Sequence, residues 1–441
     1  MPATQQIPTF NLKAVLQETG LKPDTLRAWE RRYGLPQPER SPGGHRLYSQ
    51  RDIDIIKWLM ARQQEGLSIS RAVDLWRSLE AGGQDPLHMV EFAVPEAAPF
   101  PTVRPEGVAL AELRQAWISA CLNYDERTAE QVLTQAFALY PVEVVCLDLL
   151  QKGVAELGAG WYRGEVSVQQ EHFASELAIR RLEALLAATP APTRPERILT
   201  ACPPQEEHTF SPLLLTLFLR RRGWNVLYLG ANVPIARLDA AITTTKPQLA
   251  VLPAQQLHTA ASLLGMARSL QDQRIPLAYG GLVFNLVPAL RARIPGYFLG
   301  ERLDDAPRVV EQVLSSPRPM PSGEPIPQVY QHALTHFRER QGMIEAYVWQ
   351  SMDATGEGRE NLTVANTHLA LNIIAALKLG DMAFLGADVE WVEGLLGYHR
   401  LPRKLLYDYL DVYRRAAETH LDERGAPVVD WLARVVGAGS N

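Results

Sequence analysis

The sequence predicts a multidomain α and α/β chain, and three observations support this fold class. The 441 residues, with a hydrophobic content of 46%, exceed what one core holds and indicate three or four domains. Residues 197–301 alternate short apolar strands with helical stretches, which is typical of a doubly wound parallel sheet. Residues 108–188 and 328–441 show helical periodicity and predict a four-helix bundle and a C-terminal helical bundle, and a small winged helix-turn-helix unit precedes them.

Proline-rich segments predict where these domains separate. The stretches "PEAAPFPTVRP" and "PRPMPSGEPIP" are typical of stiff linkers, and "TPAPTRPE" precedes the first strand of the sheet. The predicted domains span residues 1–82, 108–188, 195–316 and 328–441, with linkers at 83–107 and 317–327.

Charge and cysteine usage limit the possible partners. Residues 1–80 hold 12 Lys and Arg against 9 Asp and Glu, whereas the rest holds 32 against 40, so only the front end is a candidate for binding nucleic acid. Cys121, Cys146 and Cys202 form no C-x-x-C pair, which argues against a disulfide framework or a zinc knuckle. No signal-peptide pattern is present, and no stretch approaches the roughly 20 apolar residues of a membrane span. We therefore expect a cytoplasmic protein without a membrane partner.

The N-terminal segment has the pattern of a winged helix-turn-helix. Two short helices flank a turn at Gly20, and the second begins near Pro23 and Asp24, which suit the first turn of a helix. A tight turn at residues 42–44 then joins two short extended arms, and a third helix is expected from Asp52. The helix after it stops at the glycines of residues 82–83, so no long coiled coil is encoded and pairing of these heads must come from downstream.

The stretch "TLRAWERRYGLPQPERSPGGHRLYS" resembles the winged-helix domain of MerR-type transcription regulators, over about seventy residues. The resemblance implies double-stranded operator DNA as the partner, read by one helix in the major groove and by the wing. Arginine suits both tasks because its planar fork binds phosphates and guanine edges with two hydrogen bonds. The implied contact residues are Arg27, Trp29, Arg31 and Arg32 on the helix and Arg40, His45, Arg46 and Tyr48 on the wing. For Trp29 and Tyr33, a place in the hydrophobic core is the alternative.

A histidine follows the first predicted strand of the sheet domain. Ligands of doubly wound sheets bind at the carboxyl ends of the strands, where His208 is expected. Glu206 is placed to hold one ring nitrogen of this histidine and leave the other free for a metal. A helix-capping or core histidine is the alternative.

Glu206, His208 and Ser211 resemble the D-x-H-x-x-G signature of cobalamin-binding domains, and Gly280 with Gly281 matches their late Gly-Gly pair. The resemblance implies that His208 binds cobalt and that the glycines lie beside the nucleotide tail of the cofactor. Two departures stand out: Ser211 replaces a glycine, and residues 253–255 replace the usual S-x-L.

Trp161 followed by Glu171 and His172 resembles the W-x9-E-H motif in the helical bundle of CarH-type adenosylcobalamin photoreceptor repressors. The order of head, bundle and sheet domain matches as well, over about residues 7–315. The resemblance implies that Trp161 is a flat wall for the adenosyl group and that Glu171 and His172 bind it by hydrogen bonds. It also implies a homo-oligomer, dimer or tetramer, that represses in the dark and dissociates when light cleaves the cobalt–carbon bond. Tyr162 stands where the family often has a histidine that captures cobalt after photolysis, and a bundle-core position for Trp161 is the alternative.

The C-terminal 110 or so residues carry three helical segments with apolar stripes. We expect His332 and His336 on one helix face at the surface, and an aromatic interior formed by Trp349, Trp391, Tyr398, His399, Tyr407 and Tyr409. One interpretation is a domain for contact or oligomerisation. The other is a resemblance to the tails of photocobilins, which implies a noncovalently bound bilin because the region lacks cysteine.

These features together predict a light-responsive, DNA-binding transcriptional regulator, a repressor that uses adenosylcobalamin as chromophore and is not an enzyme. One alternative keeps the MerR-type head but senses the cobalamin level or another tetrapyrrole, such as haem or bilin. The other is an enzyme module, since cobalamin mutases and methyltransferases share the middle domain, but such an enzyme needs a substrate barrel that the sequence lacks.

Overall fold

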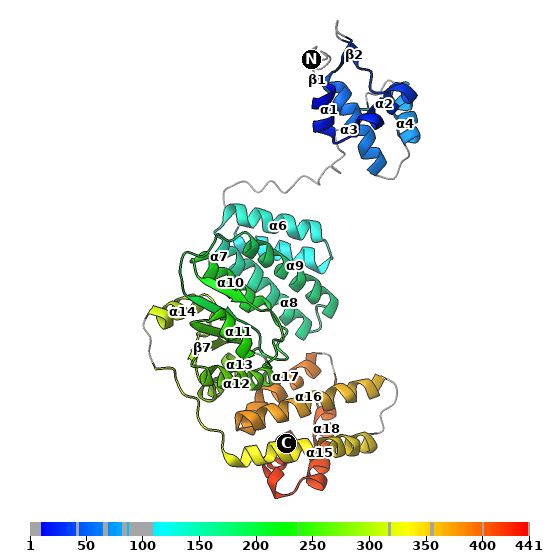
Figure 1. Ribbon diagram of the computed structural model, residues 1–441. Coiled ribbons are helices and arrows are strands. Elements are labelled where there is room, and N and C mark those ends of the chain that lie inside the picture. Colours follow the sequence, from blue (N-terminus) through cyan, green and yellow to red (C-terminus); the bar gives the residue numbers. More distant parts are fainter. Residues whose placement is uncertain are drawn as a thin grey trace. The chain divides into compact units, whose positions relative to one another are not determined.

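A computed structural model divides the chain into two compact units, residues 1–107 and 108–441 (Figure 1). The structure describes residues 10–40, 44–64, 69–81, 86–87, 109–236, 238–315, 319–352, 357–398 and 401–439. Apart from residues 86–87, the predicted linker at 83–107 lies outside this set, as do Pro42, Gly43 and His399. The predicted fold class is confirmed in each unit, whereas the predicted domain boundaries stay a prediction.

The first unit is a winged helix-turn-helix. Its elements are β1 (Phe10–Asn11), α1 (Leu12–Thr19), α2 (Pro23–Tyr33), β2 (Glu39–Arg40), β3 (Arg46–Tyr48), α3 (Gln50–Gln64) and α4 (Ile69–Ala81). Asn11 caps α1 by accepting the Ala14 N–H, and Gly20 ends the helix with a left-handed φ of 69°. The three strands form a small antiparallel sheet in the order β1-β3-β2, and β2 with β3 makes the predicted wing.

The second unit begins with the predicted four-helix bundle. Its elements are α5 (Leu110–Leu122), α6 (Glu126–Leu139), α7 (Val142–Val145), η2 (Cys146–Gln151), α8 (Lys152–Tyr162) and α9 (Val168–Ala187). The third rod runs without a break through α7, the π-helical η2 and α8. Gly153 lets this rod approach α5, because a Cβ there would lie 2.8 Å from the Trp117 ring. Ser167 and Gln170 form a capping box that begins α9 between Trp161 and Glu171 of the predicted motif.

The sheet domain follows the bundle and has the predicted alternation of strands and helices. Its elements are β4 (Arg197–Thr200), α10 (Phe210–Arg221), β5 (Asn225–Tyr228), α11 (Leu238–Thr245), β6 (Leu249–Pro253), α12 (Leu257–Asp272), β7 (Leu277–Gly280), α13 (Val283–Leu286), η3 (Pro288–Arg293), β8 (Tyr297–Phe298) and α14 (Ala306–Ser315). All neighbouring strands are parallel, in the order β5-β4-β6-β7-β8. This order places the ends of β4 and β6 side by side, which is the switch point where doubly wound domains bind ligands.

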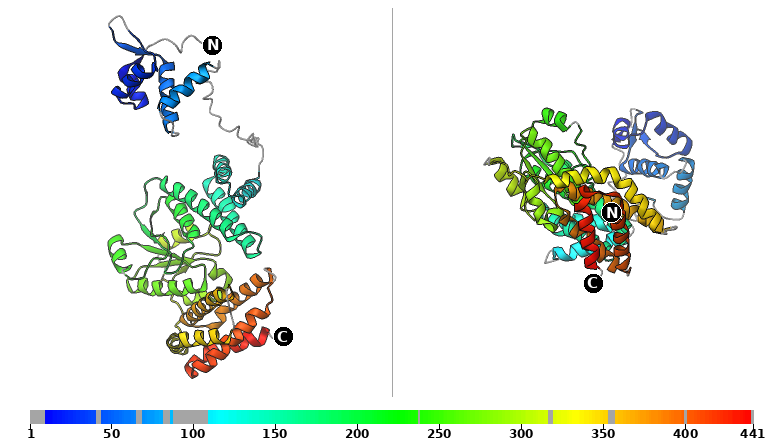
Figure 2. Two further views of the ribbon diagram at one scale, coloured as in Figure 1. Left: turned by 90° about the vertical axis from the view of Figure 1, so that its right-hand side faces the viewer. Right: turned by 90° about the horizontal axis from the view of Figure 1, so that it is seen from below.

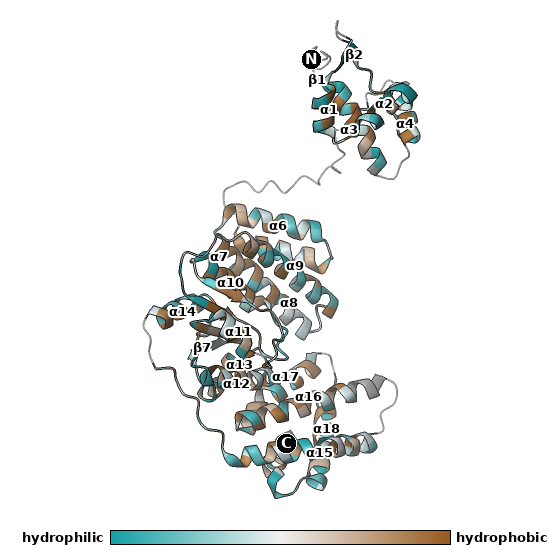
Figure 3. Cartoon of the chain, viewed as in Figure 1, coloured by the Kyte–Doolittle hydropathy of each residue, from teal (hydrophilic) through white to brown (hydrophobic). Residues whose placement is uncertain are grey.

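Helix α10 belongs to two cores at once. Leu215 and Leu219 pack on the sheet together with Val251 of β6, whereas Leu214 and Phe218 pack among the bundle helices. Eight consecutive residues from Pro212 to Leu219 are therefore buried, and the helix is predominantly hydrophobic in Figure 3. The bundle and the sheet domain consequently share one apolar layer through this helix.

The C-terminal domain is a second helical assembly. Its elements are α15 (Gln328–Ser351), α16 (Glu357–Leu379), η4 (Met382–Leu385), α17 (Gly386–Tyr398), α18 (Lys404–His420), η5 (Glu423–Gly425) and α19 (Ala426–Gly439). Helix α16 packs against α12 of the sheet domain, as Figures 1 and 2 show, and one apolar cluster runs through both domains. The C-terminal domain is thus continuous with one face of the sheet domain.

Three expectations about this domain are corrected. His336 is buried, with only 2% of its side chain exposed, and its Nε2 accepts the Asp422 N–H at 3.1 Å. Trp391 and Tyr398 do not line the interior, because they are 43% and 53% exposed on α17. A helical period places both residue types on predictable faces, but which face meets the core depends on tertiary packing that the period does not encode.

Helix α16 also corrects the expectation about membrane-length segments. Its residues Leu362–Leu379 are long and apolar enough, by length and composition, to cross a membrane. Half of this window is buried inside the protein, where Ile373 and Ala376 belong to the apolar cluster shared with α12. The apolar character of the segment is therefore accounted for by its place in a core between two domains.

Asp388 in the first turn of α17 predicts a pH dependence of stability. Burial raises the pKa of its carboxyl from 3.8 to about 6, and its Oδ2 has no hydrogen-bond partner among the described residues. Between these pH values the folded state binds one more proton at Asp388 than the unfolded state. The contribution of Asp388 to the free energy of unfolding therefore falls as pH rises from about 4 to about 6 and then levels off. We expect Asp388→Asn to stabilise the protein above pH 6 by about 2 kcal/mol and to flatten this dependence.

Thermal unfolding midpoints at pH 4.5 and pH 7 measure this effect. Asp430→Asn, at an exposed position of α19, is the matched control and should leave the midpoint difference as in the natural chain. A midpoint of Asp388→Asn that differs from the natural chain equally at both pH values contradicts the assignment.

Candidate functional site

His208 and Glu206 meet at the carboxyl end of β4, as expected from the sequence. The buried Glu206 Oε1 lies 2.7 Å from His208 Nδ1 and also accepts the His208 backbone N–H at 3.0 Å. Because a carboxylate only accepts hydrogen bonds, Nδ1 carries the proton and Nε2 keeps its lone pair. The His208 side chain is 59% exposed, so this lone pair is available to a metal.

The Glu206 carboxylate is fully buried but satisfied. Its Oε2 accepts the backbone N–H of Gln255, at the end of β6, at 2.7 Å. Burial alone raises the pKa of Glu206, but hydrogen bonds from His208, Gln255 and Thr259 outweigh burial and lower the pKa below its usual value. The carboxylate is therefore ionised at neutral pH and fixes the orientation of the imidazole.

The charges that act on His208 come from its own loop and from the bundle. The hydrogen bond to Glu206 is the main cause that raises the pKa of His208, and the Glu171 carboxylate on α9 adds a smaller rise. A charge acts on a neighbour in this way only over a short distance. Glu171 of the bundle is therefore near enough to His208 of the sheet domain for its charge to act on the imidazole.

The lid residues lie at the junction of α8 and α9. Trp161 is half-buried near the end of α8, and Glu171 is in the first turn of α9. Glu171 accepts a hydrogen bond from Ser175 at 2.7 Å and lies 2.9 Å from His172 Nδ1, whose side chain is 73% exposed. The lid thus offers an aromatic surface and an exposed imidazole paired with a held carboxylate.

Tyr162, the departure from the expected histidine, is engaged by the C-terminal domain. Its hydroxyl donates to the Trp391 carbonyl at 2.9 Å, and its ring lies 5.5 Å from the Trp391 ring and 5.4 Å from the Tyr398 ring. Burial and the neighbouring Tyr398 raise the pKa of Tyr162, so the phenol stays protonated and donates. This side chain therefore contacts α17 rather than lying free in the site.

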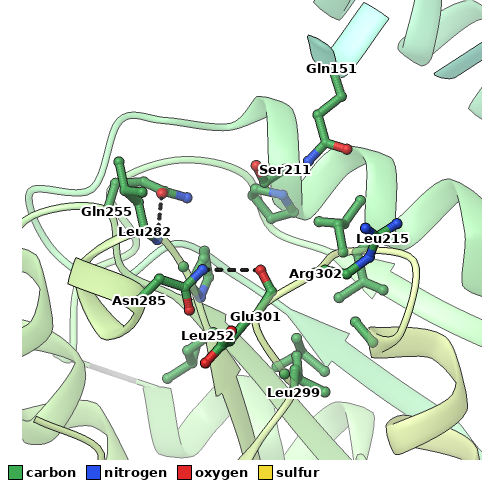
Figure 4. Close-up of a pocket in the computed structure, with 18 residues that line it drawn as sticks. Gln151, Ser211, Leu215, Leu252, Gln255, Leu282, Asn285, Leu299, Glu301 and Arg302 are labelled. Carbon is green, nitrogen blue, oxygen red and sulfur yellow. Dashed lines mark hydrogen bonds between the residues drawn. The ribbon is translucent and has the colours of Figure 1, made fainter. Parts of the chain in front are cut away.

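A cavity of about 220 Å³ opens at the carboxyl ends of the strands (Figure 4). Ser211, Gly280 and Gly281 line it as the sequence predicts, together with Leu215, Leu252 and Leu299 from the sheet and α10. Gly281 is required by the fold itself, because its φ is +119° and a Cβ would lie 2.0 Å from the Ala254 carbonyl oxygen. The apolar wall with a polar rim suits a ring system attached to a polar chain.

Several site residues were not predicted from the sequence. Gln255 holds Glu206 by its backbone and accepts the Leu282 N–H at 2.9 Å by its side chain, and Gln151 of the π-helical η2 reaches the same cavity from the bundle. The altered S-x-L sequence was the only signal for Gln255, and η2 gave none. Burial is the first cause that lowers the pKa of His258 on α12.

The basic side chains predicted to contact DNA are exposed on the first unit. These are Arg27, Arg31 and Arg32 on α2, Arg40 on β2 and His45 before β3. Arg46 is half-buried, because its Nε donates to Glu30 at 2.9 Å. The exposed set has the charge and the position that phosphate and base contacts need.

Trp29 and Tyr48 are corrected from contact residues to supporting residues. Trp29 is 5% exposed and Tyr48 is fully buried in the core of this unit. The Tyr48 hydroxyl donates to Glu30 at 2.5 Å, next to the bond from Arg46 to the same carboxylate. Glu30 thereby fixes the wing against α2, and the two aromatic side chains support this contact from the core.

Comparisons with known proteins agree with the fold of the first unit and with a cobalamin-binding second unit. The model of the MerR HTH family regulatory protein matches residues 10–79, and that of the B12 binding domain matches residues 113–186. The transcriptional repressor CarA of Myxococcus xanthus is 35% identical over 249 residues, covering 55% of this chain and 76% of CarA. CarH of the same organism is 29% identical over 276 residues, covering 62% of this chain and 89% of CarH. A monomethylamine corrinoid protein from Methanosarcina barkeri is similar in structure, with 17% identity, 46% and 100% coverage and a TM-score of 0.41.

The fold and the site define a DNA-binding regulator with a MerR-type head and a cobalamin-binding second unit. More particularly, the chain belongs to the family that includes the HTH-type transcriptional repressors CarA and CarH of Myxococcus xanthus. The two matched family models end before the sheet domain and the C-terminal domain.

The two kinds of head residue predict different effects on DNA binding. Arg31→Ala removes an exposed cation, so we expect the salt dependence of duplex DNA affinity to fall by about one phosphate contact per head. Tyr48→Phe removes one buried hydrogen bond, so we expect a loss of stability of about 1 kcal/mol with an unchanged salt slope.

Fluorescence-anisotropy titrations of a labelled duplex at several salt concentrations measure both slopes. A slope unaffected by Arg31→Ala, or lowered by Tyr48→Phe, contradicts the division into contact and supporting residues.

Proposed function

We propose that this protein is a light-responsive transcriptional repressor that uses adenosylcobalamin as its chromophore. The observation that carries the proposal is His208 at the carboxyl end of β4, whose Nδ1 is held by the buried Glu206 so that Nε2 is left for a metal. His208 would supply the imidazole for one side of a corrin ring, and Glu171 with Trp161 would supply a carboxylate and an aromatic surface for an adenosyl group on the other side. The membership of the CarA and CarH family supports the regulatory role over an enzymatic one.

On the lower side, His208 would bind cobalt through Nε2. The neutral imidazole with its second nitrogen held by a carboxylate is the arrangement that makes histidine a good metal ligand. The cavity lined by Ser211, Gly280 and Gly281 would receive the nucleotide tail of the cofactor. The hydroxymethyl group of Ser211 takes space that a glycine would leave open, so it would narrow the room for the tail.

On the upper side, Trp161 would face the adenosyl group, with Glu171 and His172 as hydrogen-bonding partners. Adenosylcobalamin supplies a cobalt–carbon bond that light breaks. Tyr162 is bound to Trp391, so His172, paired with Glu171 and 73% exposed, is the lid imidazole that would be available to the upper side of the cofactor. The alternative occupant of that position is water.

Assembly would connect the site to DNA. In the sequence, the glycines at residues 82–83 and the proline-rich stretch up to Pro105 do not encode a long coiled coil after α4, so the heads would need the second unit to bring them together. Several linked heads bind an operator far more tightly than one, because the second contact forms at high effective concentration. We propose a dimer or tetramer that holds the operator in the dark and separates in the light.

The full chain loaded with adenosylcobalamin in darkness tests this function. We expect green light to lower the mass in solution and to weaken duplex DNA binding by at least about 100-fold, as linked heads become single ones. Light scattering coupled to size exclusion, the absorption spectrum and DNA titrations give the three readouts. If light changes none of them while added cobalamin changes DNA binding, the protein senses the cobalamin level instead.

Glu206→Gln tests the lower half of the site. Its amide would set an N–H group against the Gln255 N–H or against the imidazole, so we expect the affinity for adenosylcobalamin to fall by about 10- to 100-fold. Glu207→Gln changes the neighbouring exposed carboxylate in the same way and should leave the affinity unchanged. Isothermal titration in darkness measures both. Equal affinities for the two variants would show that Glu206 does not support a cobalt ligand.

A noncovalently bound bilin is a second candidate cofactor. A cavity of about 640 Å³ lies between the sheet domain and the C-terminal domain, walled by Leu264, Leu334 and Leu377. Arg268 and Lys378 line it, and neither forms an ion pair with a described residue, so they are suited to the carboxylates of an amphipathic ligand. A red-absorbing species that copurifies after co-expression with a bilin source would distinguish this reading from cobalamin alone.

A further inference from the structure

Helix α17 is the part of the C-terminal domain that reaches the bundle. No residue of this helix is fully buried, although the domain around it has a continuous core. Val389 packs on that core, and Tyr407 of α18 donates a hydrogen bond to Glu393. The helix is therefore held to its own domain along one side and leaves Trp391 and Tyr398 exposed on the other.

The exposed aromatics of α17 form a seat for Tyr162. The Tyr162 hydroxyl donates to the Trp391 carbonyl at 2.9 Å, and both aromatic rings of α17 lie within 5.5 Å of the tyrosine ring. The Trp161 and Trp391 ring centroids are 6.2 Å apart, so the seat extends to the lid tryptophan. Two consecutive lid residues thus contact one helix of a domain that begins more than 160 residues later.

Gly394 makes this seat possible. A Cβ at this position would lie 1.9 Å from the Tyr162 hydroxyl oxygen and 3.1 Å from the ring carbon that bears it. Glycine is otherwise a poor choice inside a helix. By contrast, a Cβ at Gly397, one turn further along the same helix, would meet nothing within 4 Å. The glycine at 394 therefore has a specific role in the contact with Tyr162.

The C-terminal domain consequently touches both halves of the cofactor site. Helix α16 packs on α12 of the sheet domain, which begins two residues after Gln255, the residue whose N–H binds Glu206, while α17 holds the end of the lid helix α8. Because the C-terminal domain packs on the sheet domain and also contacts the end of α8, it restrains the separation of the bundle from the sheet domain.

We propose that α17 is a latch on the lid, with Tyr162 as the positioning residue through which the C-terminal domain controls how readily the bundle opens above the site. The latch keeps the Tyr162 hydroxyl on the Trp391 carbonyl and keeps Trp161 at the upper face. The role of Trp161 as the upper wall rests on the proposed function, whereas the latch contact itself does not.

The first test uses the full chain without cofactor and follows amide hydrogen exchange of α17 and of residues 160–167. Gly394→Ala should speed exchange in both segments by about tenfold or more, although alanine favours the helix. Gly397→Ala is the matched control and should slow exchange or leave it unchanged. Exchange in α5, far from the seat in sequence, reports whether a variant has unfolded globally.

Tyr162→Phe makes the test specific to the hydroxyl. Alone it removes one hydrogen bond and should speed exchange about fivefold. Combined with Gly394→Ala, it removes the atom that the new Cβ would strike, so the double variant should exchange no faster than Tyr162→Phe. A Gly394→Ala variant that behaves like Gly397→Ala, or a double variant whose effects simply add, overturns the latch.

The second test measures the dark dissociation rate of adenosylcobalamin from the same variants. Gly394→Ala should raise this rate at least about fivefold, and the double variant should return it to that of Tyr162→Phe. Faster exchange in α17 without a faster dissociation rate refutes control of the lid. A chain that binds no corrinoid at all refutes the proposed function, and the exchange data then still decide whether α17 is seated on Tyr162.

Discussion

The buried carboxylate of Glu206 is the constraint on which the site depends. A charged group without exposure is tolerated only when every lone pair finds a donor, and here the donors come from the loop after β4 and from the end of β6. The backbone carbonyl of the same residue accepts the Asn232 N–H at 3.0 Å, which adds the loop after β5. Three neighbouring strand ends are therefore fixed around one side chain. Any change in His208, Gln255 or these loops would leave a buried charge incompletely bonded, so the geometry of the histidine follows from the electrostatics of its neighbour.

The second constraint is the shared helix α10. Because this helix contributes to the bundle core on one side and to the sheet core on the other, the bundle is not an independent lid that merely rests on the sheet. Separation of the whole bundle from the sheet would therefore expose the apolar layer that α10 shares with both. The π-helical η2 lies within the same rod as α8 and places Gln151 over the strand-end cavity. Helical segments of this kind often mark functional positions, since they alter the register of the residues that follow.

The sequence predicted the elements well and their packing partners less well. Hydrophobic period and turn residues located the winged head, the bundle rods and all five parallel strands, because these signals are local. They also located His208 beside Glu206, since two residues in one loop remain close in any fold. The family resemblance implied Trp29 and Tyr48 as DNA contacts, with a core place as the alternative for Trp29, and the helical pattern placed His336 at the protein surface, whereas all three are buried. Which face of an element is covered depends on contacts across the chain, and one sequence does not record them.

The C-terminal domain illustrates this limit and also gives the added segment a physical role. Its aromatic residues suggest an interior from composition alone, yet Trp391 is outside the core and contacts Tyr162, 229 residues away along the chain. The substitution of tyrosine for the expected lid histidine gains its meaning only from that contact, because a phenol supplies both a ring to stack and a hydroxyl to donate. A lid histidine is suited to bind metal, whereas Tyr162 in this seat binds protein. The α17 contact is a restraint outside the bundle, so its strength becomes a variable that sets how tightly the lid is held, separate from the cofactor chemistry below.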